Sequence, residues 1–327
     1  MPPISLLDLC PVLEGGSARD SMRHMLDLAR HAERWGYGRY WLAEHHSLPG
    51  VASAATAVVM TAVASATSII RVGAGGIMLP NHAPLLIAEQ FGTLESLFPG
   101  RIDLGLGRAP GSDQITQRAL RRGPDSADRF PEDVLELQAW FRHPEPGQVV
   151  RAVPGAGLTI PLWILGSSLF GAQLAAALGL PFSFASHFAP AQMTQAVQLY
   201  REQFQPSEQL SKPYVMLAMN VIAAESDAEA RFLFSSLQQA FVNLRRGRPG
   251  LLPPPRADFD QQLSVTEQAM LTSALACSAI GSPRTVRDAI ASFAEHTGAD
   301  ELILTSQVYD HDARLRSFEI AIDGARS

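Results

Sequence analysis

The segment PLLIAEQFGTLESLFPGRIDLGLGR, residues 84–108, contains one helix followed by one strand. Apolar residues recur at helical spacing from Pro84 to Leu97, and Pro99-Gly100 ends the helix. Residues 102–106 then form a short strand that runs into Gly107 and Arg108. A strand that follows a helix of this length favours a parallel sheet, because parallel strands need long crossover connections.

The same alternation extends in both directions along the chain. Eight strands are expected, at residues 4–9, 39–43, 70–74, 102–106, 162–165, 182–185, 214–223 and 301–305. Eight is the number that closes a (β/α)8 TIM barrel, and an open doubly wound sheet is the competing architecture. At about 150 residues per domain the length suggests two domains. The eight units nevertheless occupy most of residues 1–327, so we predict an α/β fold with a single barrel domain.

Two segments interrupt the alternation of strands and helices. Residues 108–129 are rich in arginine, glycine and aspartate, and we expect a loop with a short helix there. Residues 245–275 begin basic and proline-rich, and we expect a second irregular insertion. Both should lie at the carboxyl-terminal rim of the barrel, where loops shape the active site. Residues 149–158 have the turn-flanked pattern of a small hairpin.

Composition excludes several function classes. A net charge of −6 argues against nucleic-acid partners and against a polybasic membrane anchor. The two cysteines, Cys10 and Cys277, cannot form a disulfide framework and suit a reducing cytoplasm. Residues 47–70 carry no charge, but they are mainly Ala, Ser, Thr and Val, which favours a helix packed on protein over a membrane span. Residues 1–10 lack the basic start of an export signal, so we expect a cytoplasmic protein.

Two histidines follow the second predicted strand, in the sequence Glu44-His45-His46. Neighbouring side chains of an extended segment point to opposite faces, so one histidine can face the barrel mouth while the other packs or pairs with an acid. Imidazole suits a general base or a proton shuttle, and a hydrogen-bonded structural histidine is the alternative. The remaining histidines show no ligand spacing, and we predict no metal site.

Three other strand ends carry candidate ligand-binding residues. Gly75 and Gly76 would let a flat ring lie against the backbone. Arg108 suits a phosphate, with a surface ion pair as the alternative. Gly166, Ser167 and Ser168 open a helix, where free amides and hydroxyls bind anions or simply cap the helix. Arg108 and this turn together suggest one phosphate held from two sides, and Ser186 lies at the rim after the sixth strand.

Taken together, these motifs resemble the bacterial luciferase-like family of flavin-dependent monooxygenases, in its single-component-length subgroup. The segments that carry the resemblance are residues 44–46, 73–80, 80–84, 100–108, 107–111, 281–283 and 309–311. The resemblance implies a barrel, often a homodimer, that receives reduced FMN from a separate NAD(P)H-dependent flavin reductase. It further implies that O2 reacts to give a flavin C4a-hydroperoxide, which oxygenates a small organic substrate.

The resemblance also assigns roles. His45 matches the active-site histidine, and Gly75 with Gly76 matches a non-proline cis peptide beside the flavin. Arg108 and the residues 166–168 match the phosphate site. Gly107 stands where luciferases have a reactive cysteine, which counts against light emission. Two alternatives remain, a deazaflavin-dependent dehydrogenase on the same barrel and a non-catalytic flavin-binding protein; no role is assigned to Asp113.

Overall fold

A single parallel sheet closes into a barrel in the computed structural model, which describes residues 1–109 and 114–326. The strands are β1 Ile4–Asp8, β2 Arg39–Leu42, β3 Arg71–Met78, β4 Ile102–Gly107, β5 Leu162–Gly166, β6 Phe182–Phe184, β7 Val215–Ala223, β8 Ser278–Gly281 and β9 Glu301–Thr305. Their order is β6-β5-β4-β3-β2-β1-β9-β7-β8, and β6 also pairs with β7. That pairing closes eight strands into the predicted (β/α)8 barrel, with β8 outside the ring.

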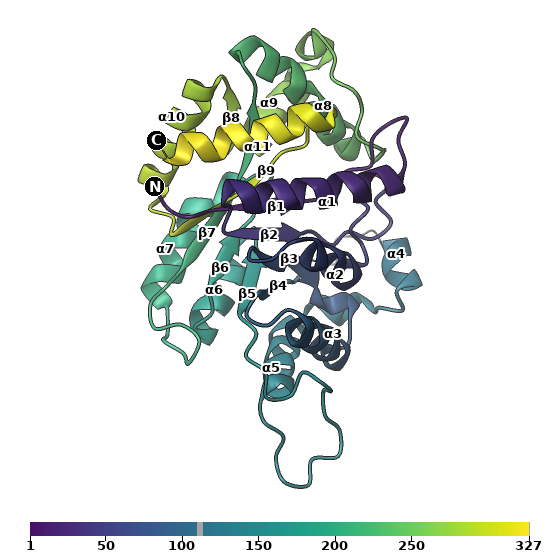
Figure 1. Cartoon of the computed structure of the whole chain (residues 1–327), viewed down its shortest axis with the longest axis vertical. Coiled ribbons are helices and arrows are strands. Elements are labelled where there is room, and N and C mark those ends of the chain that lie inside the picture. The colour runs from purple at the N-terminus through teal and green to yellow at the C-terminus, as the bar shows by residue number, and fades with distance from the viewer. Residues whose placement is uncertain (110–113, 327) are drawn as a thin grey trace.

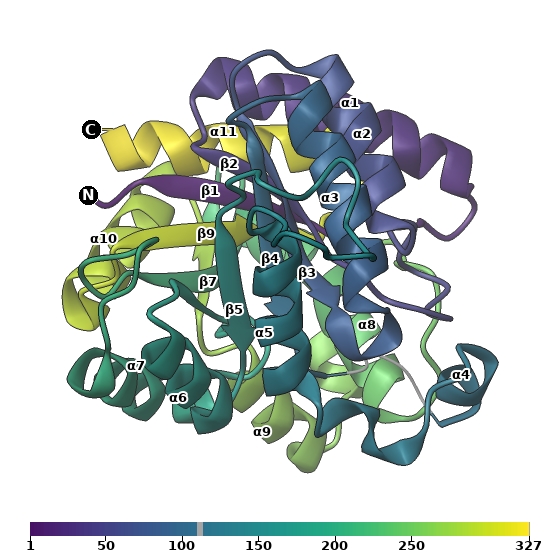
Figure 2. The same ribbon diagram turned by 90° about the horizontal axis from the view of Figure 1, so that it is seen from below.

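The helices lie outside the strands (Figures 1 and 2). They are α1 Ala18–Trp35, α2 Thr56–Ala66, α3 Pro84–Leu97, α4 Gln114–Ala119, α5 Phe130–Phe141, α6 Leu169–Leu178, α7 Met193–Gln203, α8 Asp227–Arg245, α9 Val265–Ala274, α10 Pro283–Thr297 and α11 His311–Arg326. Short 3-10 turns are η1 Leu79–Asn81, η2 Pro124–Ala127, η3 Pro190–Gln192 and η4 Phe259–Gln262. Among the helices described, none is both long and apolar enough to cross a membrane.

A buried ionic network fills the end of the barrel at which the strands begin. Asp103 on β4 is fully buried and accepts hydrogen bonds from Arg39 at 2.7 Å and from Arg71 at 2.6 Å. Arg39 also pairs with the buried Glu301 at 3.0 Å, and Tyr214 donates to Glu301 at 2.9 Å. All five residues lie at or near strand starts. Buried charges need such partners, so this network fixes the end of the barrel that lies opposite the carboxyl-terminal rim.

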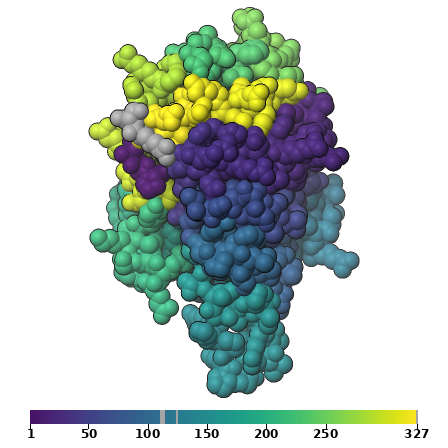
Figure 3. Space-filling model, in the orientation of Figure 1, coloured from purple at the N-terminus to yellow at the C-terminus, as the bar shows by residue number. Residues whose placement is uncertain are grey.

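The predicted hairpin at residues 149–158 is wrong. Residues 142–161, which we call the arm, leave α5 and return to β5 without any strand, and they protrude from the body of the molecule (Figures 1 and 3). The Val153–Pro154 peptide is cis. Gly155 packs so closely on Gly92 of α3 that a Cβ at Gly92 would collide with the Gly155 Cα. The segment therefore packs on a helix, and its apolar residues do not pair as strands.

The insertion at residues 245–275 is less irregular than predicted. It contains α9, whose capping box joins Ser264 and Glu267. The Ser-x-x-Glu pattern was a readable signal for this helix start. The strand β8, which directly follows the insertion, was missed because its four residues are too few to show a period. It pairs with the last four residues of β7.

Candidate active site at the carboxyl ends of the strands

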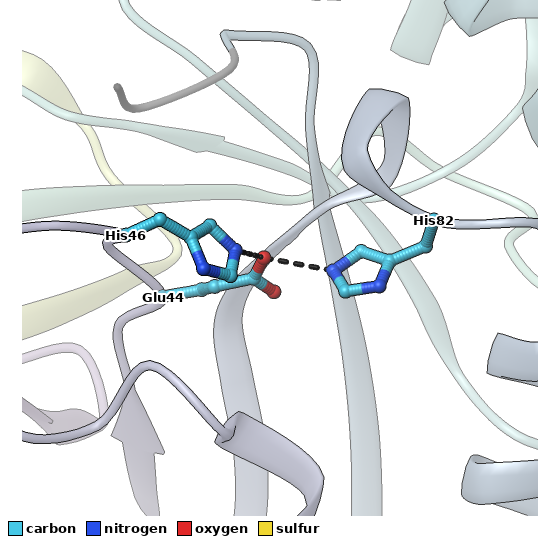
Figure 4. A group of neighbouring side chains, drawn as sticks. All are labelled: Glu44, His46 and His82. Carbon is cyan, nitrogen blue, oxygen red and sulfur yellow. Dashed lines mark hydrogen bonds and ion pairs between the residues drawn. The ribbon is translucent and has the colours of Figure 1, made fainter. Parts of the chain in front are cut away.

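A buried carboxylate joins two imidazoles at the barrel mouth (Figure 4). Glu44 follows β2 and is only 1% exposed. Its Oε1 atom lies 2.6 Å from His46 Nε2 and 2.8 Å from His82 Nε2, while its Oε2 atom accepts the Met78 N–H at 3.3 Å. His46, one of the two predicted catalytic histidines, therefore pairs with an acid.

The donor set of this cluster is one that transition metals accept, because two imidazoles and one carboxylate converge. The spacing is nevertheless that of hydrogen bonds. Donor atoms around a tetrahedral zinc ion lie about 3.3 Å apart, given bonds of about 2.0–2.1 Å. The two separations of 2.6 and 2.8 Å match charge-assisted hydrogen bonds instead. The arrangement of Glu44, His46 and His82 thus fits shared protons better than a bound metal ion.

His45 and His187 form a second imidazole pair at the mouth. His45 is half-buried after β2, and His187 follows β6 with a buried Nδ1 that has no hydrogen-bond partner within the described part of the chain. Burial, and then the charge of His45, lower the pKa of His187 to about 3. Asn220 on β7 donates to the His187 carbonyl at 2.6 Å and fixes its backbone. His187 is therefore neutral at physiological pH.

The glycine-rich end of β3 has bare backbone at the mouth. The Gly75–Gly76 peptide is cis, as the resemblance implied, and both residues are half-exposed. A Cβ at Gly75 would lie 2.8 Å from Leu7 Cδ1, and one at Gly76 would lie 2.7 Å from the Gly105 carbonyl oxygen. The neighbouring backbone therefore leaves no room for a side chain at Gly76, whereas at Gly75 the nearest atom is the end of the flexible Leu7 side chain. The absence of side chains also leaves a flat surface that suits an aromatic ring system.

Arg108 lies over the amino-terminal turn of α6. Its guanidinium carbon lies 4.2 Å from the centre of the Phe170 ring, and Phe170 is in the first turn of that helix. The N-cap residue Ser168 makes no side-chain capping bond. No described carboxylate pairs with Arg108, and the described residues give Ser167 no side-chain hydrogen bond. An exposed cation thus lies against a side chain in the first turn of a helix that has no side-chain cap, and both features favour an anion.

Ser186 and Asp113 contribute differently. The buried Ser186 hydroxyl donates to the Ala218 carbonyl at 2.6 Å, so it holds the end of β6 against β7. Only its lone pairs are left for a ligand. Asp113 lies outside the described residues.

Neither cysteine is placed for thiol chemistry. Cys10 and Cys277 are free and buried. Burial raises the pKa of both thiols, that of Cys277 to about 11. Since the thiolate is the reactive form, neither is a nucleophile at neutral pH.

The sequence analysis missed the roles of Glu44 and His82. His82 lies 36 residues from His46, so no ligand spacing links them along the chain. The available signal was position, because both residues follow the carboxyl ends of neighbouring strands, β2 and β3. In a parallel barrel these ends meet at one rim.

Comparison with known proteins gives consistent matches. A family model described as luciferase-like monooxygenase matches residues 7–301. A luciferase-like monooxygenase of Escherichia coli K12 is 57% identical over 320 residues, covering 98% of this chain and 96% of the relative. The N-acetyl-S-alkylcysteine monooxygenase of Bacillus subtilis 168 is 34% identical over 75% of each chain.

Two solved structures share the architecture. The crystal structure of apo-MsnO8 superposes with a TM-score of 0.87 at 33% identity, covering 100% of this chain and 99% of that one. The oxygenating constituent of 3,6-diketocamphane monooxygenase from Pseudomonas putida, in complex with FMN, gives 0.71 at 18% identity, with 98% and 96% covered. The second likeness concerns the fold alone.

Proposed function

The chain belongs to the luciferase-like monooxygenase family, whose members are oxidoreductases, and on that premise we propose that it is an FMN-dependent monooxygenase. The observation that carries the proposal is the position of Arg108 over the uncapped start of α6. Arg108 and the residues 166–168 would hold the FMN phosphate, and the backbone of Gly75 and Gly76 would lie against the ring. Bound reduced FMN supplies the electrons that activate O2.

The chain's own residues have three tasks in this proposal. Arg108 and the α6 amides bind and orient the cofactor. His45 moves a proton at the mouth, close to His187, whose pKa is lowered by burial so that it stays neutral. Arg122, in the described part of the insertion, holds the backbone of Asn81 beside the mouth. As membership of this family implies, reduced FMN would arrive from a separate NAD(P)H-dependent flavin reductase.

The decisive experiment is an anaerobic calorimetric titration of the protein with reduced FMN, followed by oxygen-electrode assays with candidate substrates. We expect one FMN per chain and substrate-dependent oxygen uptake. Thioethers and ketones form the first substrate panel, because the two relatives above are named for such oxidations. Absence of reduced-FMN binding would overturn the proposal. Binding without any oxygen turnover would indicate the non-catalytic flavoprotein, and substrate oxidation by a deazaflavin without oxygen would indicate the dehydrogenase.

Replacing Arg108 with alanine should weaken the binding of reduced FMN by about 10- to 100-fold, because a charged hydrogen bond is worth about 1.5–3 kcal/mol. Riboflavin lacks the phosphate, so its affinity should stay nearly unchanged. The same anaerobic titration measures both ligands. Arg151→Ala on the arm is the matched control and should change neither affinity. An equal loss for FMN and riboflavin would contradict the phosphate assignment.

We further propose a homodimer that forms through α2. An uncharged stripe of small and apolar side chains runs along the outer face of α2 and the residues just after it, and consists of the exposed residues Val58, Ala62, Ser65 and Ile69. Val58 is 70% exposed and Ile69 is 78% exposed, although the surrounding residues 47–70 carry no charge that would keep this face in water. A second copy of the chain presents the same stripe, so the two faces can cover each other around a twofold axis.

Replacing Val58 with glutamate should convert the dimer to a monomer, because two carboxylates would be buried against each other at the twofold axis. Light scattering after size-exclusion chromatography gives the molar mass, which should fall by half. Val149→Glu, at a 93% exposed position on the arm, is the control and should leave the mass unchanged. A monomeric wild-type protein, or a dimer that survives Val58→Glu, would contradict this interface.

A further inference from the structure

The Glu44 carboxylate contacts two imidazoles through a single oxygen atom. His46, two residues after Glu44 in the sequence, contacts Oε1 through Nε2. His82, which directly follows η1, contacts the same oxygen. Figure 4 shows the two rings on opposite sides of this oxygen. An ionised carboxylate can only accept hydrogen bonds, so both rings must donate from Nε2.

This arrangement fixes the tautomer of both rings. A neutral imidazole that donates from Nε2 carries a lone pair on Nδ1. The described residues give neither His46 Nδ1 nor His82 Nδ1 a hydrogen-bond partner. Both Nδ1 atoms are therefore available as proton acceptors at the mouth of the barrel.

The buried charge of Glu44 determines what the cluster can hold. No described arginine or lysine pairs with Glu44, and its remaining contact is the Met78 N–H. With two neutral rings the cluster carries one negative charge. A proton that arrives at either Nδ1 is therefore accepted by a ring that still donates from Nε2 to Glu44.

The segment that carries His82 is also held by the rim insertion. Arg122 donates to the carbonyl of Asn81, the residue before His82, at 2.9 Å. Arg122, in the described part of the insertion, therefore contacts the backbone next to this cluster directly. His82 is thus fixed from two sides, by Glu44 through its ring and by Arg122 through its backbone.

We propose that Glu44 is a positioning residue that sets His46 and His82 as a matched pair of Nδ1 proton acceptors. The pair lies next to His45 and would accept protons in the active site. The use of the pair in turnover rests on the proposed function, whereas the tautomers do not.

The first test is nuclear magnetic resonance of the wild-type protein labelled with 15N at its histidines. Long-range 1H–15N spectra distinguish Nε2–H from Nδ1–H rings, and His46→Asn and His82→Asn identify the signals. We expect both neutral rings as the Nε2–H tautomer. Glu44→Gln should abolish this uniform state, because an amide presents a donor as well as an acceptor. Glu95→Gln, which removes a carboxylate that accepts from Gly100 N–H at the far end of α3, is the matched control.

Several outcomes would overturn the proposal. One is an Nδ1–H tautomer for either ring in the wild type, a result that does not depend on any variant folding. Another is an unchanged pair of Nε2–H signals in folded Glu44→Gln. A third is a stoichiometric metal ion in the purified protein that is lost in His82→Asn, because the three side chains would then hold a cation instead of protons.

The catalytic consequence has a separate readout. With a substrate from the panel above, Glu44→Gln should lower kcat by about 10²-fold, the lower range for a positioned proton-transfer group, and should leave the affinity for reduced FMN within a few-fold. Equal losses in kcat and in FMN affinity would indicate a structural role and overturn the proposal. If the wild type consumes no oxygen, the proposed function fails while the tautomer measurement still decides the role of Glu44.

Discussion

Replacing His45 with alanine is expected to lower kcat by about 10²- to 10⁴-fold, the usual contribution of a general acid–base group. His45 stands at the carboxyl end of β2, where barrel enzymes place their chemistry. Its neighbour His187 cannot replace it, because burial and the charge of His45 lower the pKa of His187 to about 3. A base that is protonated only near pH 3 is a weak acceptor at neutral pH.

The measurement is product formation with a substrate from the panel, with reduced-FMN affinity determined in parallel. The affinity should change by no more than a few-fold, because the proposed phosphate site, Arg108 and the start of α6, lies elsewhere. His143→Ala on the exposed arm is the control and should retain wild-type kcat. A loss of less than about tenfold in kcat for His45→Ala would contradict the assigned role.

Replacing Asp103 with leucine is expected to lower the free energy of unfolding by about 3–5 kcal/mol, because the change leaves buried charges without their partner. Asp103 accepts hydrogen bonds from Arg39, Arg71 and the Trp41 indole, the last at 3.2 Å. Glu301 would still balance Arg39, but Arg71 would lose its only described ion pair.

Urea unfolding, followed by circular dichroism, measures this loss. The comparison variant is Asp288→Leu, which breaks exposed ion pairs with Arg284 and Arg287 and should cost less than about 1 kcal/mol. The folded fraction of Asp103→Leu should bind reduced FMN normally, since the network lies at the end of the barrel opposite the rim. A cost near that of Asp288→Leu would show that the network does not stabilise the barrel.

The sequence was sufficient to predict the barrel because each unit repeats one local pattern. Residues 84–108 already contain a helix stop, a strand and the residues at its end, and these lie in α3 and β4 as expected. The arm and β8 escaped prediction for a different reason. Their conformations depend on contacts with α3 and with the end of β7, and those partners are distant along the chain.

The candidate site divides in the same way. Strand-end position was enough to single out His45 and Arg108 from the sequence. It could not show that Arg108 lies over Phe170, or that Glu44 reaches His82, because both contacts cross between different strand–helix units. Hydrophobic periodicity in the sequence shows to which strand–helix unit a residue belongs. Which units contact one another is determined only when the sheet closes into a barrel.

The arm offers a practical attachment point. It connects the end of α5 to the start of β5, so it leaves the barrel on the side opposite the rim. Its tip turns tightly, with the Gln148 N–H donating to the Glu145 carbonyl at 3.1 Å, while its base is held by the Gly157 N–H on the Phe141 carbonyl at 2.9 Å. A reporter domain or an affinity tag inserted at the tip would lie on the side of the barrel opposite the candidate active site. The enzyme could then be immobilised on an electrode or a resin with its mouth facing the solution.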